Sequence, residues 1–499
     1  MTPRGGWLLG LLSLALLIRL SAMVTQTYVI FADETFQYLE QGHRLAFGNG
    51  IVPWEYHDGI RSWLMPGLIA GLMRVGATVS ADPIGYLWLV RGACIGLSLV
   101  VVWAGFRLGE RVGGLAGAVL TGGGCALWFD LVWFAPVVLT ETVAAHVLIA
   151  GAVLLLPAPG QPDSASGSAP GRHAVLAGMC FGLAVSLRYH YVMAAALIAL
   201  PWAGLSLPRW RALVLGGLPT VLVLSGLLDW LSWGAPFQSI WLHALRNTAD
   251  GISSAIGTDP PVFYLAYLLV ALWPAPPLLA LAVIGATRAP TLGLAALVTV
   301  LLHSTVPHKE VRFIYLALAL LPILIGLGIT LVLARFGGLV TGARRWAAVT
   351  LALLVWAGLS LHGAIGPALA GRWSLNRGPV EAFLAASRLP ALCGLAARDM
   401  RLIDSGGYAY LHRDVPLSFS DSAGVITLPG SQVPLRFSVE RNRRSEPLRP
   451  IRPGQGYNAM IAYGENGDPD LPRIACFPDP AHPYGPAYCL FHDPARRCD

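Results

Sequence analysis

Charged residues are scarce in this chain of 499 residues. Asp, Glu, Lys and Arg together make up 12% of it, whereas 55% of the residues are hydrophobic. Soluble globular proteins carry about 25% charged residues. So little charge cannot cover the surface of a protein of this length, and lipid must replace water over much of it. The composition therefore excludes an ordinary soluble protein and predicts an all-α protein that crosses a membrane many times.

The net charge of +7 could indicate a nucleic-acid partner. The basic residues are instead scattered through short loops, as expected from the excess of Lys and Arg in the cytoplasmic loops of membrane proteins. We therefore expect membrane lipid, and no nucleic acid, as a partner.

Eleven apolar segments can cross a bilayer, and the short ones are expected to pack inside the bundle. They run over residues 6–24, 84–106, 114–133, 142–157, 174–188, 191–207, 212–231, 262–284, 290–305, 311–333 and 346–368. The first segment is read as an uncleaved signal anchor, with the N-terminus inside.

The loops support this count. With Arg4 in the cytoplasm, every inner loop is basic. These loops carry Arg107, Arg111, Arg172, Arg209, Arg211, Arg288, Arg335, Arg344 and Arg345. Counting the apolar segment 62–79 as a span would place all of them outside, so this segment is predicted to lie along the membrane surface.

CxxC pairs are absent, and the seven cysteines fall into two groups. Cys94, Cys125 and Cys180 lie in apolar runs, which is typical of core residues. The others lie in a polar C-terminal part and predict up to two disulfides with three possible connectivities, whereas a metal site is disfavoured. They are Cys393, Cys476, Cys489 and Cys498.

The composition changes near residue 370, where Pro, Arg, Asp and Gly become more frequent. We therefore expect a transmembrane domain over 1–369. A small α/β extracytoplasmic domain, stapled by disulfides, is expected over 370–499, with strands at 400–406 and 409–419.

Polar residues gather on the outer face of the predicted bundle, where charge near the membrane marks a functional site. Asp33, Glu34, Gln37 and Glu40 have a helical spacing, and the stretch WEYHDGIRS (54–62) follows them. The alternative is a solvated interfacial helix. The stretch HKEVRF (308–313) offers cations that suit a phosphate, unless Lys309 and Arg312 only anchor a helix end. Further outer polar residues are Glu141, Arg188, Tyr189, His190 and His303.

Residues 31–62 resemble the signature of glycosyltransferase family 22, the dolichyl-phosphate-mannose-dependent α-mannosyltransferases. The family core DE-x-F-x-x-x-E-x-x-H is matched by Asp33-Glu34, Phe36, Glu40 and His43. Trp54-Glu55-Tyr56, Ile60-Arg61-Ser62 and HKEVRF match the later motifs. Ala32 and Pro53 depart from the pattern, and the style of the loops resembles a bacterial member.

The resemblance implies a GT-C fold and an inverting transfer of a sugar, mannose in the family, from a polyprenyl-phosphate donor to an acceptor hydroxyl. Asp33 would be the base, with Glu34 and Glu141 as further catalytic acids. His308, Lys309, Arg312, Arg61 and Arg188 would bind the donor phosphate. Acceptor-binding or site-shaping roles fall to Glu40, His43, Trp54, Glu55, Tyr56, Tyr189, His190 and Glu310.

The resemblance also implies no obligatory cofactor or metal, and an active site on the outer side of a bacterial inner membrane. The acceptor would be a glycan, a glycolipid or a protein. Two other classes would share this architecture: a flippase or transporter of lipid-linked sugar, and a lipid-linked glycan ligase or polymerase. A transporter would not need an acidic pair in a fixed outer loop, and no matching broken helices occur in two halves of the chain.

Overall fold

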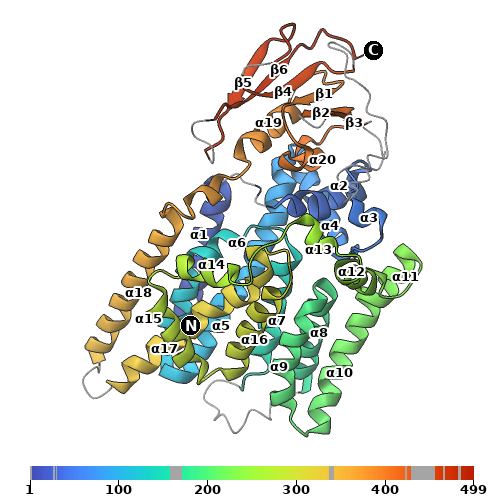
Figure 1. The fold of residues 1–499 in the computed structure, drawn as a ribbon. Coiled ribbons are helices and arrows are strands. Elements are labelled where there is room, and N and C mark those ends of the chain that lie inside the picture. The colour runs from blue at the N-terminus through green and yellow to red at the C-terminus, as the bar shows by residue number, and fades with distance from the viewer. Residues whose placement is uncertain are drawn as a thin grey trace. The chain divides into compact units, whose positions relative to one another are not determined.

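The computed structural model describes residues 3–25, 29, 31–157, 171–336, 342–421, 424–428, 456–464, 467–480 and 485–498 (Figure 1). The chain forms two compact units. Unit 1 contains Met1–Ala22 and Gly92–Ala370, and unit 2 contains Met23–Arg91 and Gly371–Asp499. The predicted division into domains at 369/370 stays a prediction. Unit 2 combines the predicted first outer loop with the C-terminal part of the chain.

Unit 1 is helical. Its elements are α1 (Pro3–Thr25), α5 (Pro83–Leu127), α6 (Phe129–Phe134), α7 (Thr140–Leu154), α8 (Gly171–Leu187), η3 (Tyr189–Tyr191), α9 (Val192–Ala203), α10 (Leu207–Val221), η4 (Leu222–Leu227), α11 (Leu228–Trp233), α12 (Gln238–Thr248), α13 (Ile252–Ile256), α14 (Phe263–Ala271), α15 (Ala275–Ala286), α16 (Pro290–Ser304), η5 (Val311–Ile314), α17 (Tyr315–Arg335) and α18 (Gly342–Ile365). Within the described residues, five stretches are long and apolar enough to cross a membrane, and the bent pair α14–α15 could be a sixth. The prediction of a multi-pass membrane protein is confirmed, and all eleven predicted segments fall on helices.

Two of the predicted spans, 84–106 and 114–133, lie largely in the two halves of α5. The helix is interrupted at Gly113 and Gly114, and Gly114 has a φ of 60°, which glycine adopts without steric cost. On either side of this break, a Cβ atom on Gly109 would collide with the backbone of Gly117, and the reverse also holds. The two halves therefore pack closely against each other as a helical hairpin.

The predicted span 262–284 is not one straight helix, because α14 and α15 meet at an angle of 100°. Pro274 lies at the break. Proline lacks the backbone N–H that a continuous helix needs, and it restricts the residue before it. The predicted surface segment 62–79 contains a single helix, α4 (Leu64–Val79), and its place on a membrane surface stays a prediction.

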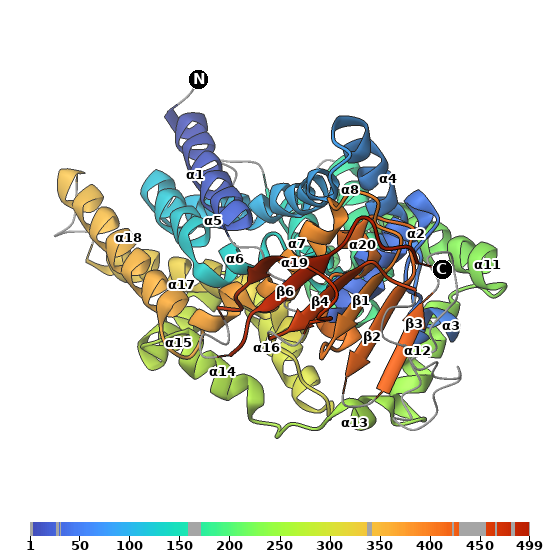
Figure 2. The ribbon, with the colours of Figure 1, turned by 90° about the horizontal axis from the view of Figure 1, so that it is seen from above.

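The C-terminal part of unit 2 is a six-stranded sheet (Figure 2). Its strands are β1 (Leu395–Arg398), β2 (Leu417–Asp421), β3 (Gly424–Leu428), β4 (Ala459–Tyr463), β5 (Arg473–Phe477) and β6 (Tyr488–His492), in the order β3-β2-β1-β4-β6-β5. Strand β1 is parallel to both β2 and β4, and the other pairs are antiparallel. Helix α19 (Arg377–Ser387) contacts β6, β5 and β4. The small C-terminal α/β part expected from the sequence is confirmed as a sheet with helices.

Two disulfides stabilise this sheet, as predicted. Cys476–Cys489 joins β5 to β6, and Cys393–Cys498 joins the segment before β1 to the C-terminal end. The other three cysteines are free thiols.

The predicted strands 400–406 and 409–419 were mostly wrong. Residues 402–404 form the short 3-10 helix η7, because Arg401 pairs with Asp404 across a local turn. Residues 407–411 form helix α20 (Gly407–Leu411), and β2 begins only at Leu417. Every residue of α20 is buried, so the segment does not alternate between a core face and a solvent face as a half-buried strand would.

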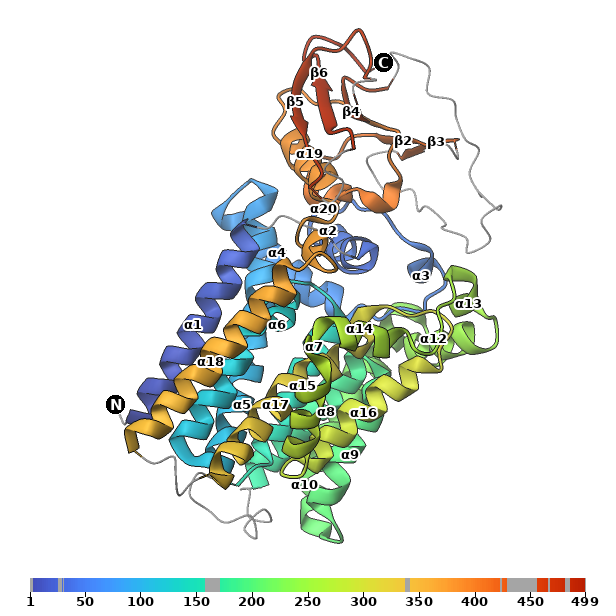
Figure 3. The same ribbon diagram turned by 60° about the vertical axis from the view of Figure 1, so that its left-hand side comes forward.

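The predicted first outer loop, in unit 2, contains four helices: η1 (Glu34–Leu39), α2 (Glu40–Phe47), α3 (Trp54–His57) and α4. Gly42 lets α2 approach α4 closely, because a Cβ atom at this position would collide with Ile69. Figure 3 shows α2 next to α20, and contacts between these two helices agree with the view.

Candidate functional site

An acidic motif occupies the start of the predicted first outer loop, in unit 2. Asp33 precedes the π-helix η1 and is half-buried. Glu34, Gln37 and Glu40 are almost completely buried, at 1%, 2% and 0% exposure. A solvated interfacial helix is therefore excluded, because three of its four polar positions lie in the protein interior. Asp33 is the motif acid with the most access to solvent.

The stretch WEYHDGIRS folds back onto this motif. Gln37 donates a hydrogen bond of 2.6 Å to Glu55, and the Tyr56 hydroxyl donates one of 3.0 Å to the Gln37 carbonyl oxygen. Burial raises the pKa of Glu55 to about 7; the Arg61 charge acts against this shift and Asp33 adds to it. Asp33, Glu55 and Arg61 therefore form one electrostatic cluster, as the density of the motif suggested. Trp54 is half-buried at the start of α3.

Glu40 and His43 hold the motif in place. Glu40 accepts backbone N–H bonds from Ile51 at 2.8 Å and from Ala409 at 2.7 Å, and burial raises its pKa to about 8. His43 contacts the carbonyl oxygen of Asn49 through Nδ1 at 2.8 Å, and Nδ1 of His412 through Nε2 at 2.9 Å. These contacts favour site shaping over direct contact with a sugar.

A second cluster lies in unit 1, around Glu141 at the start of α7. Its Oε1 atom lies 2.9 Å from Arg188 Nη2 and 3.7 Å from Arg312 Nε. Tyr191 donates a hydrogen bond to the Glu141 carbonyl oxygen. All four side chains are largely or fully buried. The structure thus brings together three predicted residues from three separate segments, and gives Glu141 two cationic neighbours.

The HKEVRF stretch extends this cluster. Arg312 also pairs with Glu310 at 2.7 Å, and His308 contacts the same carboxylate oxygen at 3.0 Å. Burial alone would raise the pKa of Glu310, but the Arg312 charge and the bond to His308 outweigh it and hold the pKa at about 2. Glu310 is therefore paired with Arg312 and restricts the orientation of its guanidinium group.

Lys309 points away from this pair. Its ammonium group donates to the backbone carbonyl oxygens of Asp259 at 2.9 Å, Val306 at 2.6 Å and Pro307 at 3.4 Å. The side chain is only 5% exposed. The predicted phosphate contact of Lys309 stays a prediction, because these carbonyl oxygens already occupy three donors, the full number that an ammonium group has.

Aromatic and imidazole rings lie near Arg188 and Arg312 in unit 1. Tyr189 stacks on His190 at 3.9 Å, and His190 lies 5.7 Å from His303 and 6.4 Å from His243. The Arg188 and Arg312 guanidinium groups lie over the Phe313 ring. His243 was not among the predicted site residues, because it matches none of the motifs and its position in the stretch 232–261 was the only signal.

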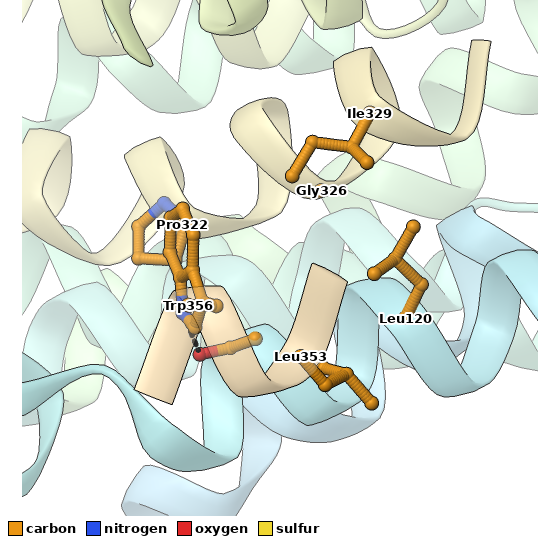
Figure 4. Close-up of a pocket in the computed structure, with 7 residues that line it drawn as sticks. Leu120, Pro322, Gly326, Ile329, Leu353 and Trp356 are labelled. Atoms are coloured by element: carbon orange, nitrogen blue, oxygen red, sulfur yellow. Dashed lines mark hydrogen bonds between the residues drawn. The ribbon is translucent and has the colours of Figure 1, made fainter. Parts of the chain in front are cut away.

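A small apolar pocket also occurs in unit 1 (Figure 4). It lies among α5, α17 and α18 and holds none of the predicted site residues. Its lining is Leu120, Gly124, Pro322, Gly326, Ile329, Leu353 and Trp356. Among the described residues, no group of three or more His, Cys, Asp or Glu side chains is placed to hold a metal ion.

Comparison with solved structures defines the class of protein. ArnT from Cupriavidus metallidurans, bound to undecaprenyl phosphate, aligns with a TM-score of 0.58 over 97% of this chain and 98% of that one, at 13% identity. Its apo state aligns with a TM-score of 0.57 at 16% identity. The chain therefore has the fold of GT-C membrane proteins, as the sequence predicted.

Sequence comparison then gives the family. Residues 10–378 match the model of the Alg9-like mannosyltransferase family, so the chain belongs to that family. GPI mannosyltransferase 3 of Yarrowia lipolytica is 26% identical over 416 residues, which cover 80% of this chain and 74% of the relative. GPI mannosyltransferase 3 of Drosophila melanogaster is 47% identical over 70 residues, covering 14% and 12%. The predicted membership of glycosyltransferase family 22 and the predicted glycosyltransferase activity are confirmed.

Proposed function

We propose that this membrane glycosyltransferase moves a mannosyl group from a polyprenyl-phosphate donor to an acceptor hydroxyl on the extracytoplasmic side, with inversion. The mannosyltransferase family supports the sugar, and the undecaprenyl phosphate bound to ArnT supports the lipid carrier. Eleven spans, with the N-terminus inside a bacterial inner membrane, would put the C-terminal part and both polar clusters outside.

The observation that carries the mechanism is the access of Asp33 compared with its buried neighbours. A general base must reach the proton that it removes. Asp33 is half-buried, whereas Glu34 and Glu40 are 1% and 0% exposed. Asp33 is therefore the base, and Glu34 helps to position the acceptor.

The proposed step is a single displacement. The acceptor oxygen forms a bond to the anomeric carbon while its proton passes to the Asp33 carboxylate. The bond from that carbon to the phosphate oxygen breaks, and its electron pair leaves with the polyprenyl phosphate. Attack opposite the leaving group inverts the anomeric centre, so that a β-linked donor gives an α-linked product.

The departing phosphate needs positive charge, which we assign to Arg188 and Arg312. One guanidinium group can donate hydrogen bonds to two phosphate oxygens at once. In a site shielded from water, it strongly stabilises the negative charge that develops on the leaving phosphate. Glu141 and Glu310 hold both groups in place before the donor arrives. His308 and Arg61 are further phosphate candidates. We assign no obligatory metal or cofactor to the reaction.

The decisive experiment uses the purified full-length chain in lipid nanodiscs. Radiolabelled polyprenyl-phosphate mannose is added with a lipid extract of the source membranes as acceptor. We expect release of free polyprenyl phosphate and label in a new glycosylated product. Transport of intact donor across vesicles without release would instead identify a flippase, and transfer of a preassembled glycan would identify a ligase or polymerase.

A further inference from the structure

We propose that helix α20 helps to position the acidic motif of the first outer loop. Within this arrangement, Arg91 and Tyr410 are positioning residues for Glu34. This inference deepens the proposed function and rests on it. All of the residues concerned belong to unit 2.

A short chain of contacts joins Glu34 to α20. Arg91 Nη2 lies 3.6 Å from Glu34 Oε1 and donates a hydrogen bond of 2.8 Å to the Tyr410 hydroxyl. The three side chains are 7% exposed or less. Because a buried charge is costly unless it is paired and hydrogen-bonded, the Tyr410 hydroxyl helps to fix the guanidinium group that faces Glu34.

The same helix makes three further contacts with the motif or its support. The Ala409 N–H group donates to Glu40, and the Ala409 carbonyl oxygen accepts from the Tyr86 hydroxyl. His412, directly after the helix, contacts His43. Residues 409, 410 and 412 therefore contact four residues of the predicted first outer loop and of the start of α5, namely Glu40, Tyr86, Arg91 and His43.

Gly407 shows how closely α20 approaches the motif. Its φ is 57°, and a Cβ atom at this position would collide with the Glu40 carboxylate and lie close to Phe36. Glu34 shares η1 with Phe36 and is adjacent to Asp33. A shift of α20 is thus transmitted to the segment that carries the proposed base, and a misplacement of about 1 Å can cost about 10²-fold in rate.

Tyr410→Phe and Tyr408→Phe form a matched pair that tests this role. Each removes one buried hydroxyl from the same helix, but the Tyr408 hydroxyl donates its hydrogen bond to the Val415 carbonyl oxygen, whereas the Tyr410 hydroxyl accepts one from Arg91. In the nanodisc assay, we expect Tyr410→Phe to lower kcat/KM for the acceptor by about tenfold, mainly through the acceptor KM, with the donor KM within about twofold of wild type. Tyr408→Phe should stay within about twofold of wild type in both.

Arg91→Lys is the second variant. Lysine keeps the buried positive charge but lacks the planar set of N–H donors with which arginine interacts with Glu34 and Tyr410 together. We expect an acceptor defect of at least about fivefold without loss of thermal stability. The inference would be overturned if Tyr410→Phe and Tyr408→Phe had equal effects. If Tyr410→Phe does not fold, a wild-type acceptor KM in Arg91→Lys would overturn it. A wild-type protein that releases no polyprenyl phosphate in the same assay would instead refute the proposed function, and the inference with it.

Discussion

Arg188 Nη2 lies 2.9 Å from Glu141 Oε1, and both side chains are almost fully removed from water. The arginine comes from the end of α8 and the glutamate from the start of α7. A buried ion pair of this kind contributes little net stability, because the desolvation of both charges offsets their attraction. In the proposed function, this pair keeps a guanidinium group oriented for the phosphate of the donor.

Arg188→Lys should therefore weaken the donor interaction. Lysine keeps the charge but loses the bidentate fork, so we expect the donor KM to rise about tenfold and kcat to fall with it. The defect should be equal for mannose and for another sugar on the same lipid phosphate. Arg246→Lys is the control, because Arg246 forms an exposed pair with Asp250 in the same unit. A defect that depends on the sugar would reassign Arg188 to sugar recognition.

Asp33→Asn tests the proposed base. The change preserves the shape of the side chain and removes its ability to take a proton, so transfer should fall by about 10²–10⁴-fold while donor binding persists. Asp58→Asn, an exposed acid in the same loop, should leave turnover unchanged. If Asp33→Asn keeps near-normal turnover in folded protein, Glu34→Gln is the next variant to measure, and full activity of both would refute a carboxylate base in this motif.

Lys309 is the only lysine in the chain, which otherwise uses arginine. A tetrahedral ammonium group can donate to three converging carbonyl oxygens, whereas the planar guanidinium group of arginine is wider. We expect Lys309→Arg and Lys309→Met both to lower thermal stability, with Lys309→Met costing about 2–4 kcal/mol. Thermal inactivation in nanodiscs measures this. Normal stability with a raised donor KM would restore the phosphate role predicted from the sequence.

Glu55 should make stability depend on pH. Burial raises its pKa to about 7 in the folded chain, against 4.5 as the ordinary value. The folded state then binds the proton more tightly, so its contribution is complete below pH 4.5 and is lost as the pH rises through 7, by about 3 kcal/mol in all.

Glu55→Gln resembles the protonated side chain and can still accept the bond from Gln37. The inactivation temperature of the variant should therefore fall less than that of the wild type between pH 5 and pH 8. Parallel curves for the two proteins would show that Glu55 does not titrate in this range.

The proposed sidedness can be measured with reporter fusions. A periplasmic reporter at about residue 380 should be active and a cytoplasmic one silent, because the basic inner loops fix the orientation of the helices. A fusion within residues 158–170, which lie outside the described residues, should give the opposite result. An active cytoplasmic reporter at residue 380 would overturn the topology and the assignment of the outer face.

Sequence patterns predicted the helices well, because a bilayer demands long apolar segments and basic inner loops. They missed the bend at Pro274, although Pro274, Pro276 and Pro277 mark a helix break, because the apolar character of α14 and α15 is continuous across it. Residues 409–411 were predicted as strand because the stretch 409–419 has the short alternating pattern of a strand. Their burial on all sides comes from tertiary contacts, which local patterns do not contain.

The candidate residues were found through their spacing and family resemblance, but their partners were not. Nothing in the sequence links Glu40 to Ala409, or Arg91 to Tyr410, because these contacts join segments more than 300 residues apart. The same holds for Lys309, whose ammonium group binds carbonyl oxygens of backbone that carries no side-chain signal. The sequence thus identified the charged residues. The structure distinguished the residues that hold other side chains in place from the residues that remain accessible to solvent.

The bond from Ala409 to Glu40 spans 369 residues. At a synthesis rate of about 5–20 residues per second, the carboxylate of Glu40 must wait roughly 20–70 s for this partner. During that time the first outer loop has already left the ribosome, but Glu40 cannot yet form its hydrogen bond with Ala409. A nascent chain interrupted anywhere before residue 409 would consequently lack this contact, which makes the end of translation the moment at which the loop can mature.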